Sequence, residues 1–327
     1  MKTSQGNVFN ISSKETFSEV ALKVFKYQAV HTPVYSQWLD ELGLDYRKIE
    51  RAEEIPFLPI SLFRDHKLIS KEFNPDLVFE SSGTTGMRRS RHFIADRGIY
   101  ERSFRTCFRI FYGEITDYII LALLPSYMDR KGSSLVYMAQ DLIKSSESEL
   151  SGFFLDDLDL LRSRITGIRN DGRKILLLGV SFALLDLAEN GNIDMNGHIV
   201  METGGMKGRR DEITREELHS FLCKSFNLDK IHSEYGMTEL LSQAYSMGDG
   251  IFRTPPWMKV LVRDPHDPFS ILDHGRTGGV NIIDLANIYS CSFIETSDLG
   301  VSHPDGSFEI LGRFDNSDIR GCNLMIS

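Results

Sequence analysis

Short apolar runs recur along the middle of this chain, and segments with helical periodicity separate them. The runs cover residues 118–124, 174–178, 198–201 and 230–233. Strands that alternate with helices in this way form parallel sheets, because the crossover helices cover both faces of the strands. The sequence therefore predicts an α/β fold whose main sheet is parallel and flanked by helices.

Polar and small residues gather where each of these runs ends. The four segments are 125–128, 179–182, 202–205 and 235–239. In open parallel sheets, ligands bind beyond the carboxyl ends of the strands. We therefore expect these segments to lie along one ligand-binding edge of the sheet.

Two helices carry recognisable start signals. Ser12 and Glu15 form a possible capping box before an apolar stripe at helical spacing, and Thr214 and Glu217 form a second one. We expect the second helix to face inward through Leu218, Phe221 and Leu222. From about residue 250, proline and glycine turns separate short β-rich runs, which predicts a small β-barrel or a second sheet.

One polar segment before the first apolar run is suited to binding phosphate. It contains six consecutive small or hydroxyl residues followed by two arginines: Ser81, Ser82, Gly83, Thr84, Thr85 and Gly86, then Arg88 and Arg89. Glycines let the backbone approach an anion, hydroxyls donate hydrogen bonds, and arginines neutralise charge. The alternative is a flexible loop of ordinary turn residues. The chain contains no Gly-x-x-x-x-Gly-Lys-Ser/Thr motif, so this is not the nucleotide loop of kinases and GTPases.

A second segment, 233–239, supplies the other groups that a nucleotide needs. Tyr235 offers an aromatic face, Thr238 a hydroxyl and Glu239 a carboxylate. These groups are suited to holding a purine, a phosphate and Mg²⁺. An ordinary surface carboxylate is the alternative interpretation of Glu239.

With both segments in this order, the chain resembles the adenylate-forming enzymes. Two later segments, 295–300 and 312–318, look like the ribose-binding motif and the hinge of that family. Within it, the chain resembles the acyl-protein synthetases, also called long-chain-fatty-acid luciferin-component ligases. The narrower resemblance lies in the Arg-Arg-Ser end of the glycine-rich loop and in segments 282–287 and 318–324.

The resemblance implies a fold and a division of the chain. The expected fold is an adenylate-forming-enzyme-like large domain over 1–312, with parallel sheets flanked by helices and a small β-rich subdomain over about 250–312. A hinge-like tail over 313–327 follows and carries Cys322. The expected cofactors are ATP and Mg²⁺.

The resemblance also implies roles for individual residues. Residues 81–86 and Arg89 would close over the β- and γ-phosphates, although Arg88 stands where many relatives have proline. Thr238 would contact the α-phosphate, and Glu239 would position Mg²⁺. The adenine would stack on Tyr235 beside Gly204 and Gly205. Asp298 and Arg313 would bind the ribose hydroxyls, with a simple turn or cap residue as the alternative interpretation of Asp298.

The tail raises the question of the acyl acceptor. In the acyl-protein synthetases, a cysteine near the C-terminus receives the acyl group, and Cys322 occupies that place. No lysine follows Lys259, so the resemblance implies a chain without the usual C-terminal lysine domain. Lys131, Lys207 and Arg320 are the candidates to replace its lysine, and the sequence does not choose among them.

The composition of the chain limits the kinds of partner and the location that we expect. The net charge of −9 argues against nucleic acid or an anionic membrane as the main partner. The longest apolar runs are shorter than the roughly 18 residues that cross a bilayer, and no signal-like core opens the chain, so we expect a cytoplasmic protein. Four scattered cysteines fit reduced thiols rather than disulfides or a zinc site.

The sequence thus predicts an enzyme that activates a carboxylic acid, most simply a fatty acid, as acyl-AMP and transfers it to Cys322 as a thioester. An acyl reductase, an acyltransferase or a carrier protein would then take the acyl group. Two alternatives stay open: a ligase that uses coenzyme A or a carrier protein as acceptor, and a non-catalytic nucleotide-binding subunit.

Overall fold

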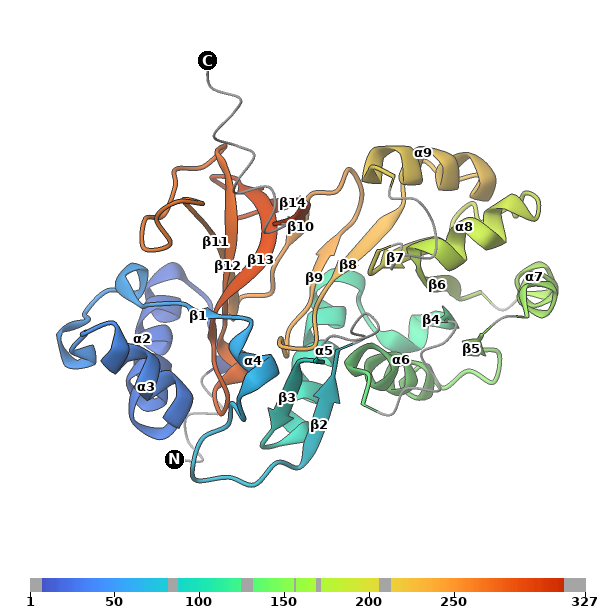
Figure 1. The fold of residues 1–327 in the computed structure, drawn as a ribbon. Helices are drawn as coiled ribbons and strands as arrows, with labels where there is room; N and C mark the ends of the chain where they lie inside the picture. The colour runs from blue at the N-terminus through green and yellow to red at the C-terminus, as the bar shows by residue number, and fades with distance from the viewer. Residues whose placement is uncertain are drawn as a thin grey trace, which may run out of the picture. The chain divides into compact units, whose positions relative to one another are not determined.

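The structure is a computed structural model that describes residues 8–81, 88–124, 132–155, 157–168, 172–205 and 213–314. The chain forms two compact units (Figure 1). The first unit contains the described residues of 1–78, 86–97 and 253–327, and the second contains those of 79–85 and 98–252. Strands β2 (Leu77–Glu80) and β10 (Phe252–Arg253) each cross a boundary between the units.

The second unit is built on a mostly parallel sheet. Its strands lie in the order β9-β8-β7-β6-β4-β5, and every neighbouring pair is parallel except β8 and β9. The bounds are β4 Tyr118–Leu123, β5 Gly152–Phe154, β6 Lys174–Val180, β7 Ile199–Thr203, β8 His232–Tyr235 and β9 Ala244–Ser246. All four predicted apolar runs are therefore strands, and the prediction of a parallel sheet is confirmed.

Helices cover both faces of this sheet. In Figure 1, α8 and α9 lie on one side of the strands, and α5 and α6 lie on the other. The bounds are α5 Arg97–Tyr112, α6 Ser134–Ser145, α7 Leu158–Gly167, α8 Ser181–Glu189 and α9 Arg215–Phe226, with a 3₁₀ turn, η3, over Ile115–Asp117. Every residue of β4 is buried, which explains why the sequence of this strand is apolar throughout rather than alternating.

Helix α9 begins as the sequence predicts. The Thr214 hydroxyl accepts a hydrogen bond from the Glu217 amide, and the Glu217 carboxylate accepts one from the Thr214 amide. Leu218 and Leu222 are buried, but Phe221 is 39% exposed, so its predicted inward orientation is wrong. The buried stripe continues through Ser225 and Phe226 instead, because these positions lie on the same helix face as Leu218 and Leu222.

The first unit combines an antiparallel sheet with helices. Strands β11 to β14 pair in sequence order, and the short strand β1 pairs in parallel with β13. The strands are β1 Leu58–Pro59, β3 Arg91–Ile94, β11 Met258–Arg263, β12 Thr277–Asp284, β13 Phe293–Ser302 and β14 Phe308–Arg313. The predicted β-rich texture after residue 250 thus corresponds to β11–β14.

The helices of the first unit precede its sheet in the sequence. They are α2 Lys14–His31, α3 Pro33–Glu41 and α4 Leu62–Asp65, with 3₁₀ turns η1 Tyr46–Lys48, η2 Ala52–Glu54 and η4 Leu285–Asn287. Helix α2 packs against α3. Its capping box consists of Ser13 and Thr16, so the predicted pair of Ser12 and Glu15 is wrong by one position. The segment offers two neighbouring serines, and the Thr16 hydroxyl replaces the carboxylate as the reciprocal acceptor.

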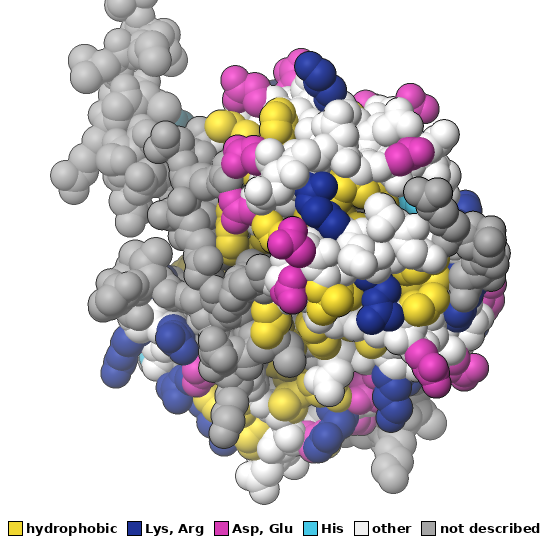
Figure 2. All heavy atoms as spheres, turned by 90° about the vertical axis from the view of Figure 1, so that its right-hand side faces the viewer, with side chains coloured by type: hydrophobic (Ala, Val, Ile, Leu, Met, Phe, Trp, Pro, Cys, Tyr) yellow, Lys and Arg dark blue, Asp and Glu magenta, His cyan; other side chains and the backbone are white. Residues whose placement is uncertain are grey.

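The architecture confirms the predicted α/β fold class. No helix among the described residues is long and apolar enough to span a membrane. Figure 2 shows the face that carries β5 and α7, where basic and acidic side chains are interspersed rather than gathered by sign.

Candidate active site

Two of the predicted site segments follow neighbouring strands of the second unit. Strand β7 ends at Thr203 and is followed by Gly204 and Gly205, whereas β8 ends at Tyr235. The two strands are parallel, and Thr203 pairs with Glu234 in the register. Their carboxyl ends therefore lie side by side, so the sheet brings the two segments together as the sequence predicts.

The backbone at this edge requires glycine at specific positions. Gly204 has a φ of 73°, in the left-handed region that favours glycine. A Cβ atom at Gly236 would lie 2.5 Å from Oε1 of Glu234. Gly236 thus makes room for a buried carboxylate.

That carboxylate, Glu234, links the two strands. It is 8% exposed and accepts a hydrogen bond from the Thr203 hydroxyl. Burial raises the pKa of the nearby Tyr100 and Tyr245 hydroxyls far above their usual range, and the negative charge of Glu234 adds to the effect. The Tyr100 and Tyr245 hydroxyls near Glu234 therefore stay neutral.

A second buried carboxylate, Glu202, lies one residue before Thr203 and is 6% exposed. Ser181 donates a hydrogen bond to it at 3.1 Å, and Nε of Arg215 and Nε2 of His219 lie 3.6 and 3.7 Å from its Oε1. Burial opposes its ionisation, but His219 and Arg215 outweigh that effect and lower its pKa. Helix α9 thereby fixes the end of β7 that leads into Gly204.

The predicted magnesium ligand is also buried. Glu239 is 6% exposed, which excludes the interpretation as an ordinary surface carboxylate, and Thr238 beside it is half-buried. Among the described residues, no three acidic, histidine or cysteine side chains gather into a metal site. Mg²⁺ usually binds through one or two carboxylates together with water and substrate phosphates, and Glu239 offers one carboxylate.

In the first unit, the structure pairs the two predicted ribose ligands. Asp298 on β13 and Arg313 on β14 are register partners, and Nε of Arg313 lies 3.2 Å from Oδ1 of Asp298. Asp298 is buried at 6% exposure, whereas the Arg313 side chain is 77% exposed. Because Asp298 lies within a strand, the interpretation as a turn or cap residue is wrong.

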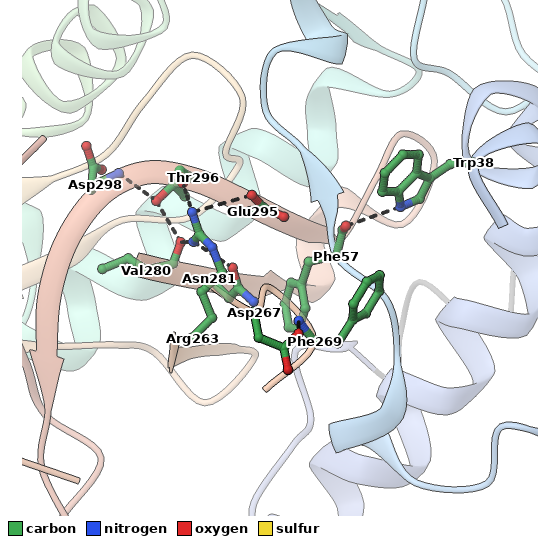
Figure 3. Close-up of polar contacts among 10 residues, drawn as sticks. All are labelled: Trp38, Phe57, Arg263, Asp267, Phe269, Val280, Asn281, Glu295, Thr296 and Asp298. Atoms are coloured by element: carbon green, nitrogen blue, oxygen red, sulfur yellow. Dashed lines mark hydrogen bonds and ion pairs between the residues drawn. The ribbon is translucent and has the colours of Figure 1, made fainter. Parts of the chain in front are cut away.

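A buried arginine that the sequence analysis did not single out lies in the same sheet. Arg263 is 7% exposed, and Figure 3 shows its guanidinium among residues of β12 and β13. It donates hydrogen bonds to the Val280 carbonyl at 3.0 Å, to the Asn281 side chain at 2.9 Å and to the Thr296 carbonyl at 2.8 Å. The only sequence signal is the pair Gly278-Gly279, of which Gly279 lies opposite Arg263 in the register.

The glycine-rich loop lies mostly outside the described residues. Ser81 is half-buried, Arg89 is exposed, and Nη1 of Arg88 lies 3.6 Å from Oδ1 of Asp65. Outside the described residues are Ser82, Gly83, Thr84, Thr85, Gly86, Lys131, Lys207, Arg320 and Cys322. Their predicted roles stay predictions.

The three described cysteines are poor nucleophiles. Cys291 is fully buried between η4 and β13, and burial raises the pKa of its thiol to about 12. Burial also raises the pKa of Cys223, and nearby acidic side chains add to that shift. Cys107 is buried in α5, where its thiol donates to the Gln243 carbonyl.

Two curated proteins are similar to this chain over most of its length. Both are named long-chain-fatty-acid–luciferin-component ligase. The protein of Vibrio harveyi is 23% identical over 337 residues, which cover 96% of this chain and 88% of the relative. The protein of Aliivibrio fischeri is 24% identical over 85% of this chain and 79% of its own. A comparison with models of protein families finds no match.

Solved structures share the fold. A structure of 2-hydroxyisobutyryl-CoA ligase in complex with 2-HIB-AMP and CoA has a TM-score of 0.68 and 14% identity, over 94% of this chain and 72% of that one. ATP-bound MatB from Rhodopseudomonas palustris has a TM-score of 0.54 and 19% identity, over 72% of this chain. The match covers 47% of MatB, so the chain spans about half the length of that relative.

The fold is that of the adenylate-forming ligases. Within that class, the chain is similar along almost its full length to the long-chain-fatty-acid–luciferin-component ligases, which confirms the predicted resemblance to the acyl-protein synthetases.

Proposed function

We propose that this protein uses ATP to activate a carboxylic acid as acyl-AMP. One observation carries the proposal: the segments that begin at Gly204 and Tyr235 leave neighbouring parallel strands, and the second segment contains the buried Glu239. A parallel sheet binds its ligands at this edge. The named relatives are ligases, which supports the same class of reaction.

Individual residues take the following roles in this proposal. Tyr235 stacks on adenine while Gly204 and Gly205 admit its edge. Asp298 accepts hydrogen bonds from the ribose hydroxyls. Its partner Arg313 adds a donor at the exposed side of the pair.

The phosphates need donors and a cation. Thr238 donates to the α-phosphate, and Glu239 is suited to hold Mg²⁺, a hard cation that prefers oxygen ligands. Magnesium would screen the polyphosphate as the carboxylate approaches. The loop over 81–86 and Arg89 complete the phosphate site.

In the proposed first step, a carboxylate oxygen of the acid bonds to the α-phosphorus of ATP, and the bond to pyrophosphate breaks. The acid is most simply a fatty acid, as the names of the curated relatives suggest. In the second step, the Cys322 thiolate attacks the acyl carbon and AMP leaves with the oxygen it received. The thioester conserves the activation for an acyl reductase, an acyltransferase or a carrier protein.

Acid-dependent exchange of labelled pyrophosphate into ATP tests the first step. We expect exchange with the wild-type protein and a panel of straight-chain fatty acids. The double variant Thr85→Val, Arg89→Ala should weaken ATP binding at least about tenfold, or ~1.4 kcal/mol, because it removes a hydroxyl and a charge from the phosphate site. Unchanged ATP affinity in the folded double variant would remove the loop from the site.

Intact-mass analysis tests the acceptor. After incubation with ATP and acid, the wild-type protein should gain one acyl group that hydroxylamine removes, whereas Cys322→Ser should still release pyrophosphate but gain none. Cys223→Ser is the matched control and should label normally. If Cys322→Ser labels like the wild type, or if coenzyme A consumes the adenylate in both, a coenzyme A ligase replaces this part of the proposal.

A further inference from the structure

Arg263, the last residue of β11, is buried in the first unit, and its side chain reaches across β12 to β13. Its guanidinium bridges β12 and β13 through three hydrogen bonds, and Oε1 of Glu295 lies 3.4 Å from its Nη2 (Figure 3). Desolvation lowers the pKa of Arg263, whereas the negative charges of Glu295 and Asp298 raise it. Removing such a charge from water is costly unless hydrogen bonds and an opposite charge compensate.

The neighbouring residues are fitted to this guanidinium. A Cβ atom at Gly279 would lie 2.4 Å from Cζ of Arg263, so only glycine leaves room for it. Asn281 turns its amide oxygen to Arg263, and its buried Nδ2 has no hydrogen-bond partner among the described residues. An unsatisfied donor destabilises the fold. This sheet therefore tolerates both the buried charge of Arg263 and the unsatisfied Nδ2 donor of Asn281.

The contacts of Arg263 lead directly to Asp298. Arg263 holds the Thr296 carbonyl, and the Thr296 hydroxyl donates to the Val280 carbonyl at 2.7 Å. The same hydroxyl accepts a hydrogen bond from the Asp298 amide at 3.1 Å. Thr296 and Asp298 alternate along β13 and are both buried. The position of the Asp298 backbone thus depends on Thr296, which Arg263 and Val280 fix.

A second contact leads to the end of the described chain. Cζ of Arg263 lies 5.6 Å from the centre of the Phe314 ring, within the range of a cation–π interaction. The Phe314 amide also donates to the Ser297 carbonyl at 2.7 Å. Arg263 and β13 together hold the residue that follows Arg313.

We propose that Arg263 is a positioning residue that fixes Asp298 for the nucleotide ribose and holds Phe314 at the entry to the C-terminal tail. The inference rests on the proposed function, because it takes Asp298 as the ligand of the ribose hydroxyls. In this role Arg263 acts through Thr296 and not by direct contact with the nucleotide. A lysine in its place would keep a positive charge but lose the planar fork that reaches three acceptors.

The preference for ATP over 2′-deoxy-ATP and 3′-deoxy-ATP in acid-dependent pyrophosphate exchange tests this role. We expect Arg263→Lys and Thr296→Val to raise the KM for ATP more than they change kcat, and to reduce the preference about tenfold, or ~1.4 kcal/mol. Asp298→Asn should reduce it similarly. The double variant Arg263→Lys, Asp298→Asn should lose little more, because the residues act through one contact.

Arg47→Lys is the matched control, because Arg47 is an exposed arginine of the same unit that pairs with Asp45. It should keep the preference. If Arg263→Lys does not fold, Thr296→Val carries the test alone. A wild-type preference retained by the folded variants, even with a lower melting temperature, overturns the positioning role and leaves the proposed function intact. A wild-type enzyme without any preference overturns the ribose assignment and this inference together.

Discussion

At the scale of single residues, buried carboxylates distinguish the candidate site. Glu202, Glu234 and Glu239 all lie at or beyond the carboxyl ends of β7 and β8, and each is less than a tenth exposed. Buried glutamate is costly unless it is paired or hydrogen-bonded. Glu202 is held by Arg215 and His219, and Glu234 by Thr203. The fold thus places buried carboxylates where the proposal requires Mg²⁺ and a polar ligand.

Replacing Glu239 with glutamine tests its role in binding magnesium. Glutamine has the same shape but no charge, so Glu239→Gln should abolish acid-dependent exchange while the melting temperature changes by only about 2–4 °C for each kcal/mol lost. Glu149→Gln, at an exposed glutamate of the same unit, is the control. Full activity of Glu239→Gln would remove Glu239 from the site.

Sequence reasoning at this scale found the residues that belong to motifs and missed those that support them. Tyr235 and Asp298 were recognisable because they stand in ordered segments with characteristic neighbours. Arg263 was not, because arginine is usually exposed and nothing local marks this one as buried, and Glu202 was recognised only as part of segment 202–205. The glycine at position 279 leaves room for the Arg263 side chain. Gly279 lies on the neighbouring strand, 16 residues further along the chain, so this relation is visible only once the two strands are paired.

At the scale of elements, the apolar runs were the reliable signal. The predicted run 118–124 corresponds to β4, Tyr118–Leu123, and 174–178 corresponds to the first part of β6, Lys174–Val180. Helix faces were less reliable. Phe221 lies three residues after Leu218, and a residue at this spacing can lie either within the buried stripe of a helix or at its exposed edge. Burial on a helix depends on the elements that pack against it, which local spacing does not specify.

Helix α9 provides a prediction at this scale, because its capping box precedes the two residues that hold Glu202. Thr214→Ala removes the hydroxyl that accepts from the Glu217 amide and should lower the free energy of unfolding by about 1 kcal/mol. Thr214→Ser keeps the hydroxyl and should behave like the wild type. Chemical denaturation measures both. Equal stability of the alanine variant would contradict the role of the cap.

At the scale of the whole molecule, the half-buried His232 makes the stability of the fold depend on pH. Burial and the nearby charge of Lys230 lower the pKa of His232 from 6.5 to about 4. Between these values the unfolded chain binds a proton that the folded protein does not, so stability rises with pH. As the pH falls from about 6.5 towards 4, this contribution to stability is lost.

Melting temperatures measured across this range test the effect. The wild-type protein should lose stability on acidification, and His232→Gln should lose less, because glutamine does not titrate and can still pair with the Tyr112 hydroxyl, which lies 3.1 Å from Nδ1 of His232. His66→Gln, at an exposed histidine, should follow the wild type. Identical pH profiles for His232→Gln and the wild type would contradict the assignment.

The central claim is that a carboxylate attacks the α-phosphorus of ATP, and isotope transfer tests it most directly. The wild-type protein is incubated with ATP and a fatty acid labelled with ¹⁸O in its carboxylate, and the nucleotide products are analysed by mass spectrometry. We expect AMP that carries one ¹⁸O atom, because the bridging oxygen of acyl-AMP stays on phosphorus when the thiol takes the acyl group. Formation of ADP, or of AMP without the label, would contradict the claim.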